Sequence, residues 1–232
     1  MALLYLDKNY PVFPDSYHAL NDPDGLIAFG GNLLPTTLMD AYRKGIFPWY
    51  QDGDPIMWWS PSKRCILRLE KFHVSKSLRK LIKKNVHTLT FNKAFSEVLK
   101  GCSAPRKNQE GGTWITNDMH EAYNRLHKLG FAHSVEVWSK GYLVGGLYGV
   151  AINGIFSGES MFSKTPNASK LALYVLCRQL RLDSFALIDC QIQTNHLLRL
   201  GAEIVSRDAF LNILSSSEDL CVKWETPTKI VM

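Results

Sequence analysis

Two polar side chains stand close together beside an apolar run near residue 190. Asp189 and Gln191 follow Ala186-Leu187-Ile188, which predicts a buried strand. Because they are two residues apart on a strand, both side chains should point to the same face of a sheet. A carboxylate beside a carboxamide can hydrogen-bond an amine, either as a general base or as a positioning group. The alternative is an aspartate that ends a strand and caps a turn, but a charge beside this apolar run needs a partner.

A second acid, Glu159, stands between Gly158 and Ser160 in sequence that also predicts a strand. Two carboxylates near one site would suit a cationic group.

The histidines give no comparable pattern, because His120 and His127 are seven residues apart and no H-x-x-x-H pair occurs. The five cysteines form no C-x-x-C pair, so neither a zinc site nor a disulfide framework is expected.

The elements that must position these residues alternate between strands and helices. Strands at residues 133–138, 143–152 and 155–160 are joined by Ser139-Lys140-Gly141 and by Asn153-Gly154, a strong hairpin signal. A helix over 168–182 and the strand at 186–191 follow. An antiparallel meander, a helix and a further strand beside the meander are the order of acetyltransferase-like (GNAT) folds. We therefore expect an α+β protein with a mixed sheet flanked by helices.

Upstream of the meander, the sequence divides near Pro61. We expect a small N-terminal domain at 1–62 and a GNAT-like catalytic domain at 63–232. The first contains a strand at 26–29, a helix at 37–44 and a strand at 56–59. The second begins with a strand at 65–69, a helix at 75–84, a strand at 87–91 and a helix at 93–99. A polar loop at 103–112 and a helix that is capped by Asn117 and ends at Gly130 come next. After the strand at 186–191, a short helix runs from Asn195 to Gly201.

GNAT enzymes that use acetyl-CoA hold its pyrophosphate on a Q/R-x-x-G-x-G/A loop at a helix N-terminus. The corresponding segment, from Met161 to Lys170, contains no glycine. A pyrophosphate therefore has no evident cradle of backbone amides. This argues against an acyl-CoA enzyme, which stays as an alternative to be tested by CoA binding.

The formal charge of +6 is concentrated in one segment. Between residues 63 and 84, nine basic side chains face only Glu70, which favours binding of a polyanion with salt-dependent affinity. The candidate nucleic-acid contacts are Lys76, Arg79, Lys80, Lys83 and Lys84. A solvated helix face and a non-catalytic RNA-binding module are the alternatives. No apolar stretch approaches the roughly 20 residues that span a bilayer, and we expect a cytoplasmic protein.

Several short segments stand out, in one collinear order between about residues 10 and 210: Gly45-Ile46-Phe47-Pro48-Trp49, Trp58-Trp59-Ser60-Pro61, Gly112-Thr113-Trp114-Ile115-Thr116, His133-Ser134-Val135-Glu136, Gly145-Gly146-Leu147-Tyr148-Gly149, Gly158-Glu159-Ser160-Met161-Phe162-Ser163, Asn167-Ala168-Ser169-Lys170 and Asp189-Cys190-Gln191. Together they resemble one known family, the leucyl/phenylalanyl-tRNA-protein transferases. The chain departs from the family at Gly111-Gly112, where one glycine is expected, and at Leu147, where methionine is common.

The resemblance implies an aminoacyltransferase. Such an enzyme moves Leu, Phe or less readily Met from aminoacyl-tRNA to a protein with N-terminal Arg or Lys, and the product carries an N-degron for protein degradation. The ester is already activated, so no cofactor, metal or ATP is implied. The partners would be the 3′ end and acceptor stem of the tRNA and the acceptor protein, and the enzyme would be a monomer.

The resemblance also assigns roles to single residues. Trp49 and Trp114 would stack on the 3′ adenosine, although both could instead be core tryptophans. The donor side chain would lie in a pocket, with Asp189 and Gln191 at the attacking amine and Glu159 at the acceptor or in the Asp189 network. The expected pocket residues are Leu147, Phe156, Ser160, Met161 and Ile188.

Overall fold

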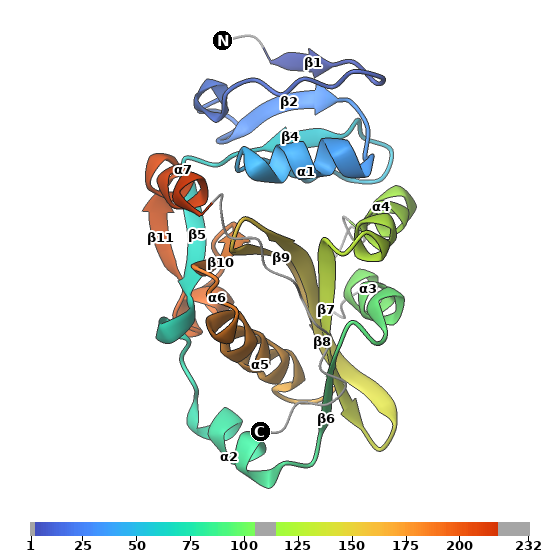
Figure 1. Ribbon diagram of the computed structural model, residues 1–232, viewed down its shortest axis with the longest axis vertical. Coiled ribbons are helices and arrows are strands. Elements are labelled where there is room, and N and C mark those ends of the chain that lie inside the picture. Colours follow the sequence, from blue (N-terminus) through green and yellow to red (C-terminus); the bar gives the residue numbers. More distant parts are fainter. Residues whose placement is uncertain (1–2, 105–114, 218–232) are drawn as a thin grey trace.

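A computed structural model describes residues 3–104 and 115–217, which form two β-sheets with helices packed around them (Figure 1). The strands are β1 (Leu4–Leu6), β2 (Leu26–Gly30), β3 (Phe47–Pro48), β4 (Met57–Trp59), β5 (Lys63–Arg68), β6 (Thr88–Phe91), β7 (Ala132–Ser139), β8 (Tyr142–Ile152), β9 (Ile155–Ser163), β10 (Leu187–Gln191) and β11 (Glu203–Ser206). The α-helices are α1 (Pro35–Arg43), α2 (Lys76–Lys84), α3 (Phe95–Ser103), α4 (Asn117–Lys128), α5 (Ala168–Leu182), α6 (Asn195–Arg199) and α7 (Arg207–Ser216). The polar loop expected at 103–112 lies almost wholly outside the described residues.

The strands divide into a small sheet and a large one. The small sheet has the order β1-β2-β4-β3, and the large sheet has the order β11-β5-β10-β9-β8-β7-β6. In the large sheet β9 and β10 are parallel, whereas the other neighbouring strands are antiparallel. The predicted α+β class with a mixed sheet is therefore confirmed, and β10 lies beside the β7-β8-β9 meander as the GNAT order requires.

The two hairpins of the meander follow from their turn residues. Lys140 and Gly141 have φ of 50° and 82°, and Asn153 and Gly154 have φ of 49° and 67°. Two consecutive residues with positive φ make the type I′ turn, whose twist matches that of the flanking strands. Both predicted hairpins are confirmed, and they fix which side chains of β8 and β9 share a face.

Helices cover both faces of the large sheet, with α5 on one side and α3 and α4 on the other (Figure 1). Since side chains alternate along a strand, Leu147 of β8 packs into the core beside α5, whereas Tyr148 packs into the core beside α3 and α4. That second core also contains Trp58 of β4. The small sheet and the large sheet therefore share one apolar core.

The structure corrects the sequence analysis of several elements, including β1 and β3, which were not predicted. Thr116, and not Asn117, caps α4, because the Thr116 side chain accepts a hydrogen bond from the Met119 amide and Asn117 is already helical. β11 and α7 were not predicted. β11 is an edge strand with no fully buried residue, so it lacks the apolar alternation that predicts a strand.

Within the described residues, no helix has the length and apolar character needed to cross a membrane.

Candidate active site

A cavity of about 1240 Å³ opens where β9 and β10 diverge. The two strands pair only from Ile155 to Ser157 of β9 and from Leu187 to Asp189 of β10. Beyond this point β9 continues to Ser163, and every residue from Gly158 to Ser163 lines the cavity. The divergence of two parallel strands thus creates the space in which a ligand can lie.

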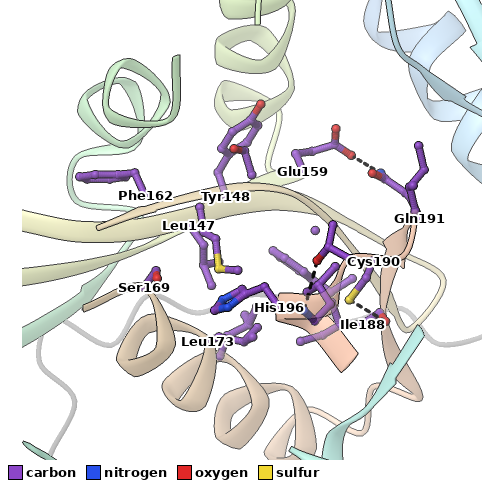
Figure 2. A pocket seen from close by; sticks show the side chains of 18 of the residues that line it. Leu147, Tyr148, Glu159, Phe162, Ser169, Leu173, Ile188, Cys190, Gln191 and His196 are labelled. Carbon is purple, nitrogen blue, oxygen red and sulfur yellow. Dashed lines mark hydrogen bonds between the residues drawn. The ribbon is translucent and has the colours of Figure 1, made fainter. Parts of the chain in front are cut away.

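The walls of the cavity are largely apolar. All five residues expected in the donor pocket line it: Leu147, Phe156, Ser160, Met161 and Ile188. The wall opposite the sheet comes from Leu173 and Leu176 of α5 and from α6, as Figure 2 shows for Leu147, Ile188 and Leu173. Sequence reasoning missed this helical wall. Leu173 and Leu176 are three residues apart on α5, a spacing that could have placed them on one helix face.

The rim of the cavity includes a segment of the small sheet. Phe47, Pro48 and Trp49 line the cavity, although they are more than a hundred residues before β10 in the chain. Trp49 is 42% exposed and contacts the Trp59 ring with a centroid distance of 5.7 Å. Its carbonyl oxygen accepts a 2.7 Å hydrogen bond from Trp59 Nε1, which fixes the backbone there. Trp114 lies outside the described residues.

Asp189 is buried and forms an ion pair with Arg64 of β5. Arg64 Nε donates to Asp189 Oδ1 at 2.8 Å, and Nη2 donates to Oδ2 at 2.7 Å. The two side chains are only 2% and 1% exposed. Arg64 Nη1 also donates to the Gly45 carbonyl oxygen at 3.1 Å. Asp189 is not among the described residues that line the cavity, and Arg64 is the partner that its burial demands.

Arg64 ties the small sheet to the large one. Its guanidinium carbon lies 4.8 Å from the centre of the Phe47 ring and 4.5 Å from that of the Phe210 ring. A planar cation between two aromatic faces is well suited to such a buried place. Sequence reasoning counted Arg64 as part of the basic surface, and that assignment is wrong. The apolar residues that follow it on β5 were a signal of burial.

Gln191 stands at the end of β10 with an unusual backbone. Its φ is 61°, and the pairing with β5 shifts register between Asp189 and Gln191. The Gln191 amide donates to Asp189 Oδ1 at 2.9 Å, which compensates for a conformation that a residue with a side chain rarely adopts. Asp189 therefore fixes the main chain of Gln191. The side chain of Gln191 lines the cavity.

Glu159 lies in a second hydrogen-bond network. Gln191 Nε2 donates to Glu159 Oε1 at 2.9 Å, and Figure 2 shows these two side chains pointing toward one another. The Tyr42 hydroxyl also donates to Oε1 at 2.7 Å, and the Tyr123 hydroxyl donates to Oε2 at 2.9 Å. Burial raises the pKa of Glu159 to about 7, although these three hydrogen bonds act in the opposite direction.

The two tyrosines come from different parts of the fold. Tyr42 is on α1, beside the small sheet, and Tyr123 is on α4. Their hydroxyl oxygens are 2.6 Å apart. Sequence reasoning assigned neither tyrosine a role in the site. No local pattern marks either residue, because their common partner is Glu159, far along the chain.

The two networks meet at Gln191. Asp189, with Arg64 behind it, holds the backbone of Gln191, and Glu159, with Tyr42 behind it, holds the carboxamide nitrogen. In the described part of the chain the carboxamide oxygen makes no hydrogen bond. Gln191 thus lines the cavity with its backbone and its carboxamide both held in place, as positioning an amine requires. No group of His, Cys, Asp or Glu side chains in the described residues is placed to hold a metal ion.

The N-terminus of α5 packs very closely against the sheet. A Cβ atom on Gly145 would lie 2.5 Å from the Cβ of Ala168. Glycine at this position of β8 lets the first turn of α5 approach the strand, and this turn brings Ser169 to the cavity. The segment from Met161 to Lys170, which contains no glycine, includes the turn between β9 and α5. In this turn only Asn167 has a positive φ.

The basic surface is narrower than the sequence suggested. Arg64 is buried, and Arg68 and Lys71 form ion pairs with Glu203 at 2.6 Å each. The five candidate contacts on α2 are all exposed, and their spacing places them along the outside of the helix: Lys76, Arg79, Lys80, Lys83 and Lys84. Figure 1 places α2 at the end of the molecule away from the small sheet.

Fold and site together define the class: an α+β protein with a mixed sheet and an apolar cavity where two parallel strands diverge. Residues 66–215 match the family described as leucyl/phenylalanyl-tRNA protein transferase, and residues 31–62 match its N-terminal domain. The chain is 49% identical to the leucyl/phenylalanyl-tRNA–protein transferase of Psychromonas ingrahamii, over 96% of this chain and 94% of that protein. It is 51% identical to that of Saccharophagus degradans, over 93% and 88%. The chain belongs to the leucyl/phenylalanyl-tRNA protein transferase family.

Solved structures give a weaker match. L-PGS from Bacillus licheniformis aligns with 82% of this chain and 72% of its own, at 12% identity and a TM-score of 0.45. A GCN5-related N-acetyltransferase-like protein from Streptococcus suis aligns with 74% and 64%, at 14% identity and a TM-score of 0.37. At this similarity, neither match supports a statement about function.

Proposed function

We propose that this protein transfers Leu or Phe, and less readily Met, from aminoacyl-tRNA to the α-amine of proteins with N-terminal Arg or Lys, and so creates an N-degron. The observation that carries the proposal is the place of Gln191, held at both ends beside an apolar cavity with an exposed tryptophan at its rim. Family membership supports both donor and acceptor.

The cavity is suited to a hydrophobic amino acid on a single-stranded 3′ end. The donor side chain would lie between Leu147 and Met161 on the sheet and Leu173 on α5. The 3′ adenosine would stack on Trp49, since aromatic stacking contributes about 1–3 kcal/mol per base. A pocket of this kind discriminates a methylene by only about 1–3 kcal/mol, which is consistent with graded preference among Leu, Phe and Met.

The reaction is aminolysis of an ester. The neutral α-amine of the acceptor attacks the ester carbonyl carbon, a C–N bond forms, and the C–O bond to the terminal ribose breaks. The amine loses a proton and the departing ribose oxygen gains one, so the step is balanced without a further reagent. Gln191 would accept a hydrogen bond from the attacking amine and orient it.

Asp189 would act as a positioning residue. Both of its oxygens accept from Arg64, and one also accepts from the Gln191 amide. A carboxylate in this setting does not reach the cavity, and its charge is already neutralised by Arg64. Its contribution to the reaction is to hold Gln191. Glu159 lines the cavity and is the acid that an N-terminal Arg or Lys would meet.

The exposed cations of α2 would contact the acceptor stem. They lie on one helix, and such a surface attracts phosphates whatever the sequence. We further propose that the enzyme acts as a monomer in the cytoplasm.

A transfer assay tests the function. Purified protein, Leu-tRNA and a peptide beginning with Arg should give a peptide extended by one N-terminal Leu, in the absence of ATP. An otherwise identical peptide beginning with Ala is the matched control and should remain unchanged. Acylation from acyl-CoA instead of tRNA would favour the GNAT alternative, and tRNA binding with no transfer would favour an RNA-binding module.

A further inference from the structure

The hydrogen atoms around Glu159 can be counted. Each tyrosine hydroxyl carries one hydrogen, and an ionised carboxylate carries none. Three close oxygen pairs occur in this cluster: Tyr42 with Tyr123 at 2.6 Å, Tyr42 with Glu159 Oε1 at 2.7 Å, and Tyr123 with Glu159 Oε2 at 2.9 Å. With Glu159 ionised, two hydrogens must serve three contacts. One pair of buried oxygens would then face each other without a hydrogen.

A neutral Glu159 removes this shortage. Its proton on Oε1 is donated to Tyr42, which reverses the direction that this contact has when Glu159 is ionised. Tyr42 then donates to Tyr123, and Tyr123 donates to Oε2, which closes a ring of three hydrogen bonds. Gln191 Nε2 still donates to Oε1, at 2.9 Å. Every contact then has its own hydrogen, so the observed distances fit a protonated carboxyl better than a carboxylate.

Among the described residues, no cation is one of the groups that act on the pKa of Glu159. The groups that face Glu159 are Tyr42 from α1, Tyr123 from α4, Tyr148 from β8, and Gln191 and Asp189 from β10. Asp189 is the charged group among them, and its negative charge opposes ionisation of Glu159. The Arg64 cation makes both of its carboxylate contacts with Asp189. Burial and Asp189 both raise the pKa of Glu159, which lies at about 7.

We propose that Tyr42, Tyr123 and Glu159 form a proton-sharing ring in which Glu159 is neutral, and that loss of the Glu159 proton breaks the Tyr42–Tyr123 hydrogen bond. The two tyrosines are positioning residues that act through Glu159 on Gln191. Because Tyr42 is on α1, the ring also couples the charge of the site to the packing of α1 against α4. This inference rests on the proposed function for its consequence in catalysis, but not for its structural claim.

In catalysis, the ring makes acceptor binding depend on pH. Below pH 7 an N-terminal Arg or Lys meets a neutral carboxyl group, and above it meets a carboxylate beside the cavity. The Michaelis constant for the acceptor therefore falls as the pH rises from 6 to 8. The same change makes the acceptor α-amine neutral, since its pKa in a free peptide is about 7.7–8.0.

Carbon-13 NMR tests the ring directly. Protein labelled at the Glu side-chain carboxyl and the Tyr Cζ positions is titrated from about pH 3.5 to 9, with signals assigned from Glu159→Gln, Tyr42→Phe and Tyr123→Phe. We expect the Glu159 carboxyl signal and both tyrosine signals to change with one common midpoint near pH 7. In Glu159→Gln the two tyrosine signals should stay constant over this range. Tyr148 is the matched control, since its buried hydroxyl has no hydrogen-bond partner in the described residues. Its signal should change much less.

Two results would overturn the inference: a Glu159 carboxyl that titrates near its ordinary value of about 4.3, or tyrosine signals that do not follow it. The kinetic arm compares the acceptor Michaelis constant in wild type and Glu159→Gln at pH 6 and 8. We expect a several-fold fall with pH in the wild type, and in the variant only the change that the amine itself causes. If wild-type protein transfers nothing, the proposed function fails while the NMR result still decides on the ring.

Discussion

Arg64 and Asp189 form a buried bidentate ion pair between β5 and β10, with donor–acceptor distances of 2.8 and 2.7 Å. The pair also receives the Gln191 amide on one side and contacts the Gly45 carbonyl on the other. It therefore joins the small sheet, the large sheet and the residue that faces the cavity. Both stability and transfer should depend on it.

Asp189→Asn should destabilise the protein, because it leaves the Arg64 cation buried without a counter-charge. Removal of one partner from a buried pair costs about 3–5 kcal/mol. Urea unfolding of wild type and variant measures the difference. Glu203→Gln, in the exposed pairs with Arg68 and Lys71, is the control and should change stability by less than about 1 kcal/mol. Equal losses in the two variants would contradict a special role for the buried pair.

Gln191→Ala should lower kcat with little effect on donor binding. The variant removes the carboxamide that orients the amine but leaves the apolar walls intact. Loss of the orientation of a reacting group can lower kcat by about 10²-fold. Single-turnover transfer at saturating Leu-tRNA measures the rate of the chemical step separately from donor binding. A variant that raises the donor Michaelis constant at unchanged kcat would show that Gln191 binds substrate instead.

Met161→Ala should shift the donor preference from Leu toward Phe. Met161 lines the cavity beside Leu147, so its truncation enlarges the proposed donor pocket. The expected change in the Phe to Leu ratio of kcat/KM is on the order of 1–3 kcal/mol, or about 5–150-fold. Competition between Phe-tRNA and Leu-tRNA in one reaction gives the ratio. An unchanged ratio would place the donor side chain elsewhere.

Glu159→Gln should gain stability over the wild type as the pH rises. Since the folded pKa of Glu159 is about 7 and the unfolded value is about 4.3, the folded state holds more protons between them. The wild type therefore loses about 1.4 kcal/mol per pH unit across this window from this group, on the order of 4 kcal/mol in all. Below the window the contribution is fully present, and above pH 7 it is lost. Urea unfolding at pH 5 and 8 measures the free energy of unfolding of both proteins. The difference between Glu159→Gln and the wild type should be larger at pH 8 than at pH 5. A difference that is the same at both pH values would mean that Glu159 ionises normally.

Replacing Lys80, Lys83 and Lys84 by Ala should weaken tRNA binding. The slope of log affinity against log salt concentration should fall by roughly 0.7–0.9 for each phosphate that α2 no longer neutralises. Arg125, Lys128 and Lys140 are also exposed cations, and their replacement by Ala is the charge-matched control. Filter binding at several salt concentrations gives both slopes. Equal effects of the two triple variants would indicate attraction by net charge alone, without a defined surface on α2.

Local patterns predicted much of the large sheet. The Asn153-Gly154 turn requires two residues at positive φ, and α5 occupies the predicted 168–182 because its apolar spacing and the preceding turn agree. These features depend on residues that are near one another in the chain.

The interactions that define the site could not be predicted in this way. Arg64 and Asp189 are 125 positions apart, and Tyr42 and Glu159 are 117 apart. No periodicity connects such residues, because their meeting depends on how the two sheets pack. The apolar flank of Asp189 did indicate that a partner was needed, but not which of the 27 basic residues would supply it.

The most direct test of the proposed transfer is the mass of an acceptor peptide after reaction with charged tRNA. A peptide beginning with Arg is incubated with wild-type protein and Leu-tRNA, without ATP or CoA, and then sequenced by tandem mass spectrometry. We predict one added leucine on the α-amine of the N-terminal Arg, and none on the peptide beginning with Ala. An unmodified Arg peptide, or leucine attached to lysine side chains instead of the N-terminus, would contradict the proposed function.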